Sequence, residues 1–100
     1  MSRKRGSRIV LRLYVAGAAP NSVTARVNLK AFLALHAAHD VELQIIDVLE
    51  DPERGLLDKI LVTPTLIRLS PLPQQRVVGN LSNRAALAAG LGLEGADDDA

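Results

Sequence analysis

The chain has 100 residues, of which 48% are hydrophobic and 23% charged, and its formal net charge at pH 7 is +1. This size and composition predict one soluble domain with an aliphatic core, because Tyr14 and Phe32 are the only aromatic residues. The absence of cysteine excludes disulfides, thiol nucleophiles and thiolate metal sites, and so few aromatics argue against base stacking on nucleic acid.

Charged residues gather at the two ends of the chain. Residues 1–8 contain four basic side chains, and residues 94–99 contain four acidic ones. We expect a flexible basic arm over residues 1–8 and a flexible acidic tail over residues 92–100, because chain termini are usually loose and charge runs usually solvated. No secretory signal is apparent, and no stretch approaches the roughly 18 apolar residues of a membrane span, so we expect a cytoplasmic protein without membrane partners.

The first half of the chain predicts a strand, a helix and a second strand. Apolar residues alternate over residues 9–15, which is typical of a strand, and residues 17–20 end it. Asn21 or Ser22 is expected to cap the helix that follows. Residues 41–48 form the second predicted strand. The predicted buried face of the helix consists of Val23, Val27, Ala31, Ala34 and Ala38.

The second half predicts a short helix, two strands and a last helix. Asp51 as N-cap with Pro52 at the first helical position opens the short helix, whose predicted apolar stripe is Leu56, Leu57, Ile60 and Leu61. Residues 65–69 and 75–78 are predicted strands joined by a hairpin-like connection. Ser82 is expected to cap a helix over residues 83–89 that Gly90 terminates. The resulting order, β-α-β-α-β-β-α, predicts a single α/β domain with thioredoxin-like architecture over residues 9–91.

The segment Val62-Thr63-Pro64-Thr65-Leu66 is of the kind that thioredoxin-like folds place beside their active site. The residue before a proline is driven out of the α region, so this segment reads as a turn that feeds a strand. We expect Pro64 to follow a cis bond and to lie beside the partner-binding edge. Because cysteine is absent, the scaffold can be present without its redox chemistry.

No residue pattern indicates catalysis. His36 and His39 supply at most two metal ligands, and their place near a helix C-terminus explains them better. A combination of Ser22, His36 and Asp47 lacks a nucleophile elbow, and the chain has no glycine-rich phosphate loop. We therefore expect no enzymatic activity, no cofactor and no metal.

Polar residues cluster where a thioredoxin-like sheet would present them. Helix caps and turns explain each residue singly, but together their chemistry suits a binding surface. The residues concerned are Asn21, Ser22, Lys59, Thr63, Asn80, Ser82, Asn83 and Arg84.

Four separated motifs of the chain resemble the KaiB family of circadian clock proteins and mark a divergent member of it. The motifs are Leu13-Tyr14-Val15-Ala16-Gly17 with Pro20-Asn21-Ser22, Ile46-Asp47-Val48-Leu49 with Pro52, Asp58 through Leu66, and Val78 through Arg84. The chain departs from the family pattern at Thr24, Asn80 and Gly92, and the change at Thr24 weakens the expectation of KaiA-type contacts.

The resemblance implies a non-enzymatic regulator that binds the KaiC ATPase and kinase ring and opposes its phosphorylated state. Further partners that it implies are KaiA or a clock-output histidine kinase system. Carried over by position, the contact residues are Asn21, Ser22, Lys59, Arg68, Arg76 and Arg84. Thr63 of the polar cluster and Pro64 of the predicted cis turn complete the predicted protein-binding set.

The resemblance also implies a switch between a tetrameric ground-state fold and a thioredoxin-like monomer. The implied fold-switch region contains Pro71, Leu72, Pro73, Ala85, Ala86, Ala88, Ala89, Gly90 and Gly92. Alanine favours helices and is depleted in strands, so we expect a thioredoxin-like monomer or small homo-oligomer at rest, with the tetramer as the minor form.

Two other functions remain open from the sequence. One is a cysteine-free thioredoxin-fold protein that binds a peptide or glutathione through the Thr63-Pro64 backbone. The other is nucleic-acid binding through the basic arm, which the low net charge and the scarcity of aromatics make the weaker alternative.

Overall fold

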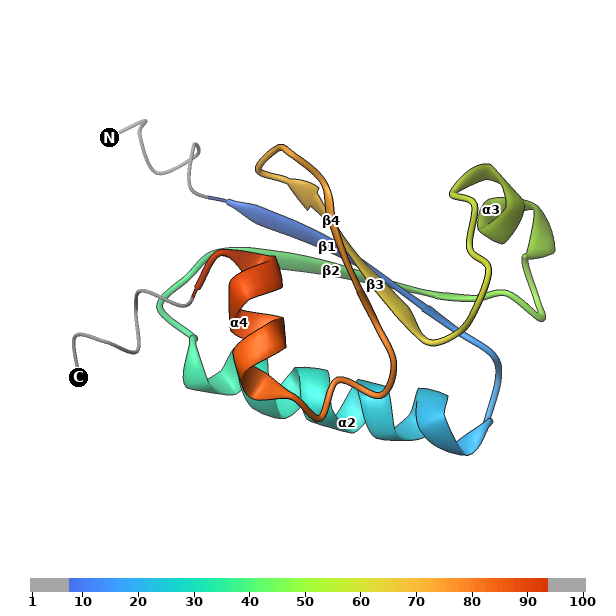
Figure 1. Cartoon of the computed structure of the whole chain (residues 1–100), viewed down its shortest axis with the longest axis horizontal. Helices are drawn as coiled ribbons and strands as arrows, with labels where there is room; N and C mark the ends of the chain where they lie inside the picture. Colours follow the sequence, from blue (N-terminus) through green and yellow to red (C-terminus); the bar gives the residue numbers. More distant parts are fainter. Residues whose placement is uncertain (1–7, 94–100) are drawn as a thin grey trace.

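Four strands form one mixed sheet in the order β2-β1-β3-β4 in the computed structural model, which describes residues 8–93 (Figure 1). Strand β1 (Ile9–Val15) pairs parallel with β2 (Val41–Asp47) and antiparallel with β3 (Thr65–Ser70), and β3 pairs antiparallel with β4 (Gln75–Val78). The helices are α2 (Pro20–Leu35), α3 (Pro52–Leu57) and α4 (Arg84–Leu91). This order confirms the predicted thioredoxin-like architecture.

The hydrophobic core lies between one face of the sheet and the helices α2 and α4, which Figure 1 shows on the same side of the strands. Alternate residues of β1, from Ile9 to Val15, are at most 5% exposed. They belong to one cluster with Leu29 of α2 and Leu87 of α4. Leu93 also joins this cluster, so the core extends two residues beyond the predicted domain end. Most of the predicted arm and tail, residues 1–7 and 94–100, lies outside the described residues.

Helix α2 buries a different face from the predicted one. Val23 and Val27 are 45% and 61% exposed, whereas Leu29 and Phe32 are at most 2% exposed. Both stripes have helical spacing, and the sheet covers the one with the larger side chains, whose burial removes more apolar area from water. The predicted caps are also wrong, because the N-cap is Ala19, without a side-chain hydrogen bond.

Helix α3 begins as predicted and packs differently. The Asp51 side chain accepts a hydrogen bond from the Arg54 amide at 3.4 Å, with Pro52 in the first helical turn. The predicted apolar stripe is wrong for its leucines, which are exposed, and the one buried residue of the helix is Gly55. A Cβ atom at Gly55 would lie 3.1 Å from Val48 Cγ1, so the helix approaches the sheet through its backbone.

Helix α4 begins and ends one or two residues later than predicted. Asn83, not Ser82, is the N-cap, and its side chain accepts the Ala86 amide at 3.0 Å. Gly92, not Gly90, ends the helix with a left-handed φ of 77°. Gly90 instead lies against β4, where a Cβ atom would come within 2.6 Å of Val77 Cγ2.

The loop before β3 and the loop after β4 lie next to each other. The Thr63–Pro64 bond is cis, as predicted, and Ser70–Pro71 and Leu72–Pro73 are cis as well. The Gly79 amide donates to the carbonyl oxygen of Pro64 at 3.0 Å, which joins the two loops at the end of the sheet.

Candidate partner-binding surface

Exposed apolar side chains gather on α3 and on the loop that leads from it to β3. Four of them, between 52% and 92% exposed, form what we call the α3 surface: Leu56, Leu57, Leu61 and Val62. Single exposed leucines are ordinary, but neighbouring ones mark sites of interaction with other molecules. This region is therefore the strongest candidate for a docking surface among the described residues.

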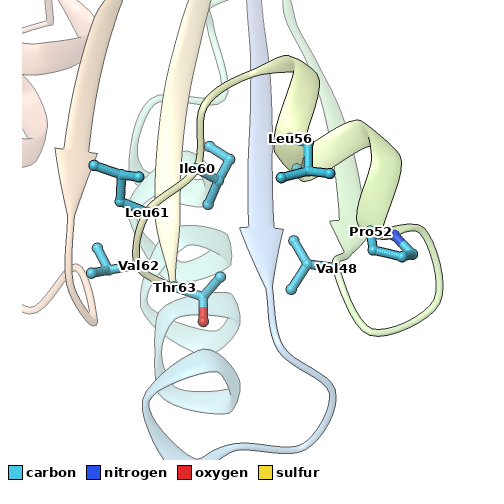
Figure 2. Close-up of a pocket in the computed structure, with 8 residues that line it drawn as sticks. Val48, Pro52, Leu56, Ile60, Leu61, Val62 and Thr63 are labelled. Atoms are coloured by element: carbon cyan, nitrogen blue, oxygen red, sulfur yellow. The ribbon is translucent and has the colours of Figure 1, made fainter.

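A groove of about 410 Å³ runs between α3 and the loop (Figure 2). Val48, Pro52 and Leu56 lie on its helix side, and the residues from Ile60 to Thr63 line its loop side. The Thr63 hydroxyl is the only polar side-chain group in this lining, and no charged side chain takes part. Such a lining suits insertion of an apolar side chain and offers no proton donor or acceptor of the kind that catalysis uses.

Beneath the loop, a polar cluster ties α3 to the outer face of the sheet. Tyr14 is fully buried, its hydroxyl donates to the Asp58 carboxylate, and it lies 3.2 Å from the carbonyl oxygen of Arg54. Arg12 Nη1 donates to Asp58 Oδ2 at 2.9 Å, and Arg12 Nε donates to Gln44 Oε1 at the same distance. Both partners of the Asp58 carboxylate come from β1, so the C-terminal end of α3 is fixed to the centre of the sheet.

The electrostatics of this cluster keep Asp58 ionised and Tyr14 protonated. Burial alone would raise the pKa of Asp58, but hydrogen bonds from Tyr14 and Arg12 and the charges of Arg12 and Arg76 outweigh it and lower that pKa. Burial, together with the neighbouring Asp58 carboxylate, raises the pKa of Tyr14. Neither group changes charge near neutral pH, so the cluster acts as a fixed anchor.

Arg76 of β4 holds the same loop from the other side. Its Nη2 donates to the carbonyl oxygen of Asp58, and its Nη1 donates to that of Lys59 at 3.4 Å. Lys59 has a left-handed backbone with φ 56°, which turns the chain from α3 into the groove loop. The Arg76 guanidinium therefore hydrogen-bonds to the main chain at the bend.

The predicted protein-binding residues divide between this region and other places. Thr63 lines the groove, Lys59 stands at the bend, and Pro64 is buried directly after the groove loop. Asn21 and Arg84 are exposed in the first turns of α2 and α4.

Two of the predicted residues point into the protein in this fold. Ser22 is 1% exposed, and its Oγ accepts the Ala16 amide at 3.0 Å. Arg68 is 8% exposed, and its Nη2 donates to the carbonyl oxygen of Pro73 at 2.8 Å. In this fold, both side chains are therefore buried and hydrogen-bonded to the main chain.

The groove residues Val48, Leu56, Leu61 and Val62 were not among the predicted binding residues. Sequence reasoning placed the leucines in the core, although a helix of six residues is too short to bury a stripe of that length. The end of the helix at Leu57 is a feature of the structure, so the sequence alone does not separate these leucines from core residues. Within residues 8–93, no acidic or histidine cluster could hold a metal ion, and no helix is long and apolar enough to cross a membrane.

Comparison with known sequences gives one consistent family. The profile of the KaiB domain matches residues 12–93. The circadian clock oscillator protein KaiB of Synechococcus elongatus is 46% identical over 84 residues, which span 84% of this chain and 82% of that protein. The same protein of Thermosynechococcus vestitus is 46% identical over 84 residues, 84% of this chain and 78% of its own length.

Solved structures agree on the fold. The N-terminal domain of Synechococcus elongatus SasA superposes with a TM-score of 0.70 at 28% identity, over 86% of this chain and 85% of that one. Mitochondrial thioredoxin 3 of Saccharomyces cerevisiae also reaches 0.70, at 18% identity, over 89% of this chain and 80% of the thioredoxin. At 18% identity, the similarity to thioredoxin 3 shows a common fold only.

Proposed function

Because the chain belongs to the KaiB family of circadian clock proteins, we propose that it is a non-enzymatic cytoplasmic regulator that binds a KaiC-like ATPase and kinase ring and opposes its phosphorylated state. The main support for this proposal is the groove between α3 and the loop that leads to β3, together with the exposed leucines around it. A ring that presents an apolar side chain to this groove would bury both surfaces.

The energy available at the α3 surface is enough for a specific contact. Full burial of one leucine side chain contributes about 1.5–3 kcal/mol, and a few buried residues usually carry most of the binding energy of a protein interface. Leu56, Leu57 and Leu61 are each more than three-quarters exposed in the free chain, so a partner would gain most of that burial.

The same groove supports binding of a protein over binding of glutathione. Glutathione carries two carboxylates and an ammonium group, and a pocket selective for it needs charged or polar partners for them. The groove offers an apolar wall and one hydroxyl, that of Thr63. An apolar protein segment therefore fits this lining better.

The proposal includes a fold switch, with the thioredoxin-like form as the binding form and the form that dominates at rest. Asn83 and Gly92 cap α4 at its two ends, and both caps favour the helical form of this segment. Backbone chemical shifts over residues 84–91 test this expectation. Helical values support it, whereas extended values together with the mass of a tetramer in light scattering would refute it.

Binding is tested by size-exclusion chromatography of the chain with its cognate KaiC-like ring and ATP, together with the phosphorylation state of the ring. The informative variant replaces Leu56 and Leu61 with glutamine, and Leu35→Gln on α2 is a matched control, because Leu35 is 64% exposed and lies outside the groove. We expect co-elution and faster dephosphorylation with the wild type and with the control. The double variant should bind about 100-fold more weakly. No complex with the wild-type chain would overturn the proposal.

A further inference from the structure

Strand β4 reaches the partner-binding groove through the side chain of Arg76, and we propose that Arg76 is a positioning residue that couples the β3–β4 hairpin to the groove. The inference rests on the proposed function, since it concerns the regulation of the same surface. Within the described residues, Arg76 is the only side chain after residue 70 that hydrogen-bonds to the segment 58–63.

The strand register explains how the side chain reaches the loop. Arg76 pairs with Ile67 of β3, and Ile67 pairs with Arg12 of β1, so the three residues form one row across the outer face of the sheet. The Asp58 carboxylate binds Arg12 in this row, while Arg76 approaches the main chain of Asp58 from the β4 side. The bend of the loop is therefore held between two cations on different strands.

Arg76 contacts backbone carbonyl oxygens, so it affects the direction in which the chain leaves the bend. The two accepting carbonyls belong to the consecutive peptides Asp58–Lys59 and Lys59–Ile60, so one guanidinium restrains both peptide planes, more tightly at Asp58 than at Lys59, where the bond is 3.4 Å long. The next residues of the chain, from Ile60 to Thr63, line the groove. The direction in which they leave the bend therefore depends on Arg76 being in place.

The remaining side-chain anchors of the bend come from β1, in the first part of the chain. Tyr14 and Arg12 bind the Asp58 carboxylate from β1, so these bonds do not involve β4, whereas the Arg76 bonds do. A chain whose C-terminal half is refolded would thus keep α3 attached but lose the arrangement of the groove loop. Arg76 in this way makes presentation of the groove conditional on the thioredoxin-like form.

Positioning by Arg76 differs from direct contact with the partner, which was the expectation from the sequence. A direct ionic contact needs only a positive charge, so Arg76→Lys would preserve it. Positioning needs the planar fork with two donors for two carbonyls, so both Arg76→Lys and Arg76→Gln should weaken it. Arg26→Gln on α2 removes the same charge from an exposed residue and is the matched control.

The test combines affinity for the KaiC-like ring with amide hydrogen exchange of the free chain. The amides of Lys59 and Ile60 are suitable reporters, because they donate to Leu56 and Gly55 carbonyls at 3.0 and 2.8 Å. In Arg76→Gln we expect about tenfold faster exchange at these two amides and about tenfold weaker binding. Exchange in α4 should be unchanged, and Arg26→Gln should match the wild type in both measurements.

Any other outcome refutes either the positioning role of Arg76 or the proposed binding of the KaiC-like ring, and the two failures can be told apart. Weaker binding with unchanged exchange at Lys59 and Ile60, or full affinity of Arg76→Lys, would make Arg76 a direct contact and refute positioning. Unchanged affinity of Arg76→Gln, with or without faster exchange at these amides, would refute it as well. If the wild type binds no ring, the proposed function fails, while the exchange rates of the free chain still decide whether Arg76 orders the loop.

Discussion

Helices α2 and α3 use their apolar residues in opposite ways. Helix α2 lies along the sheet and buries Leu29 and Phe32, whereas α3 touches the sheet through Gly55 and leaves Leu56 and Leu57 in solvent. Apolar content alone does not decide burial; the position of a helix relative to the sheet does. Apolar residues that the fold does not bury contribute little to its stability, which makes them available for binding a partner.

The largest expected effect on the free energy of unfolding comes from a core substitution in α2. Phe32→Ala removes a side chain that is 2% exposed and leaves a cavity between α2 and the sheet. We expect a loss of about 3–5 kcal/mol in the free energy of unfolding, measured by urea denaturation. A loss below about 1 kcal/mol would mean that α2 is not the principal core helix.

The next effect concerns the anchor that holds α3 to β1. Asp58→Asn removes the charge that Arg12 and Tyr14 bind, and we expect a loss of about 1.5–3 kcal/mol near neutral pH. The pH dependence gives a second readout. The pKa of Asp58 is lower in the folded chain, so its contribution is present above the unfolded value of about 3.9 and disappears as the pH falls through the folded value. Urea titrations between pH 7 and pH 2 should show this acid-side loss in the wild type and a flatter profile in Asp58→Asn; equal profiles would exclude Asp58 as the anchor.

A smaller effect tests whether α3 packs through its backbone. Gly55→Ala gains about 1 kcal/mol of helix propensity but costs about 1–3 kcal/mol of overpacking, because the new Cβ would lie 3.1 Å from Val48. We expect net destabilisation of about 1 kcal/mol by urea denaturation, with the exposed Glu53→Ala as a control in the same helix. A more stable Gly55→Ala protein would show that α3 has room to move away from the sheet.

The smallest expected effect on stability is at the α3 surface itself. Leu57→Gln changes a side chain that is 78% exposed, and the free energy of unfolding should stay within about 0.5 kcal/mol of the wild type. A loss of 2 kcal/mol or more, on the scale of a core leucine, would place Leu57 in the core and remove it from the docking surface.

What the sequence predicts well in this chain is local. The Asp51-Pro52 start of α3 and the strand alternation of β1 depend on neighbouring residues, and both are confirmed. The buried face of α2 could not be predicted, because two apolar stripes with helical spacing differ only in which one meets the sheet. Adjacent cap residues, such as Ser82 and Asn83, are equally good candidates for the same position.

The candidate site was less predictable than the fold because its contacts are distant in sequence. Tyr14 and Asp58 are 44 residues apart, and neither signals in the sequence that the other is its partner. Arg76 is 18 residues from Asp58, and its target is a main-chain carbonyl, which no residue type reveals. The family resemblance predicts a binding role for Lys59 and Arg76, and the polar cluster adds Thr63, but the groove beside α3 becomes visible only in three dimensions.

The α3 surface is tested most directly by following the leucine methyl groups by NMR while the KaiC-like ring is added. If the α3 surface binds the ring, the methyl signals of Leu56, Leu57 and Leu61 shift or broaden first, while those of Leu35 and Leu72, which are also exposed, keep their positions. The opposite pattern, with Leu35 or Leu72 responding and the leucines of the α3 surface unchanged, would contradict it.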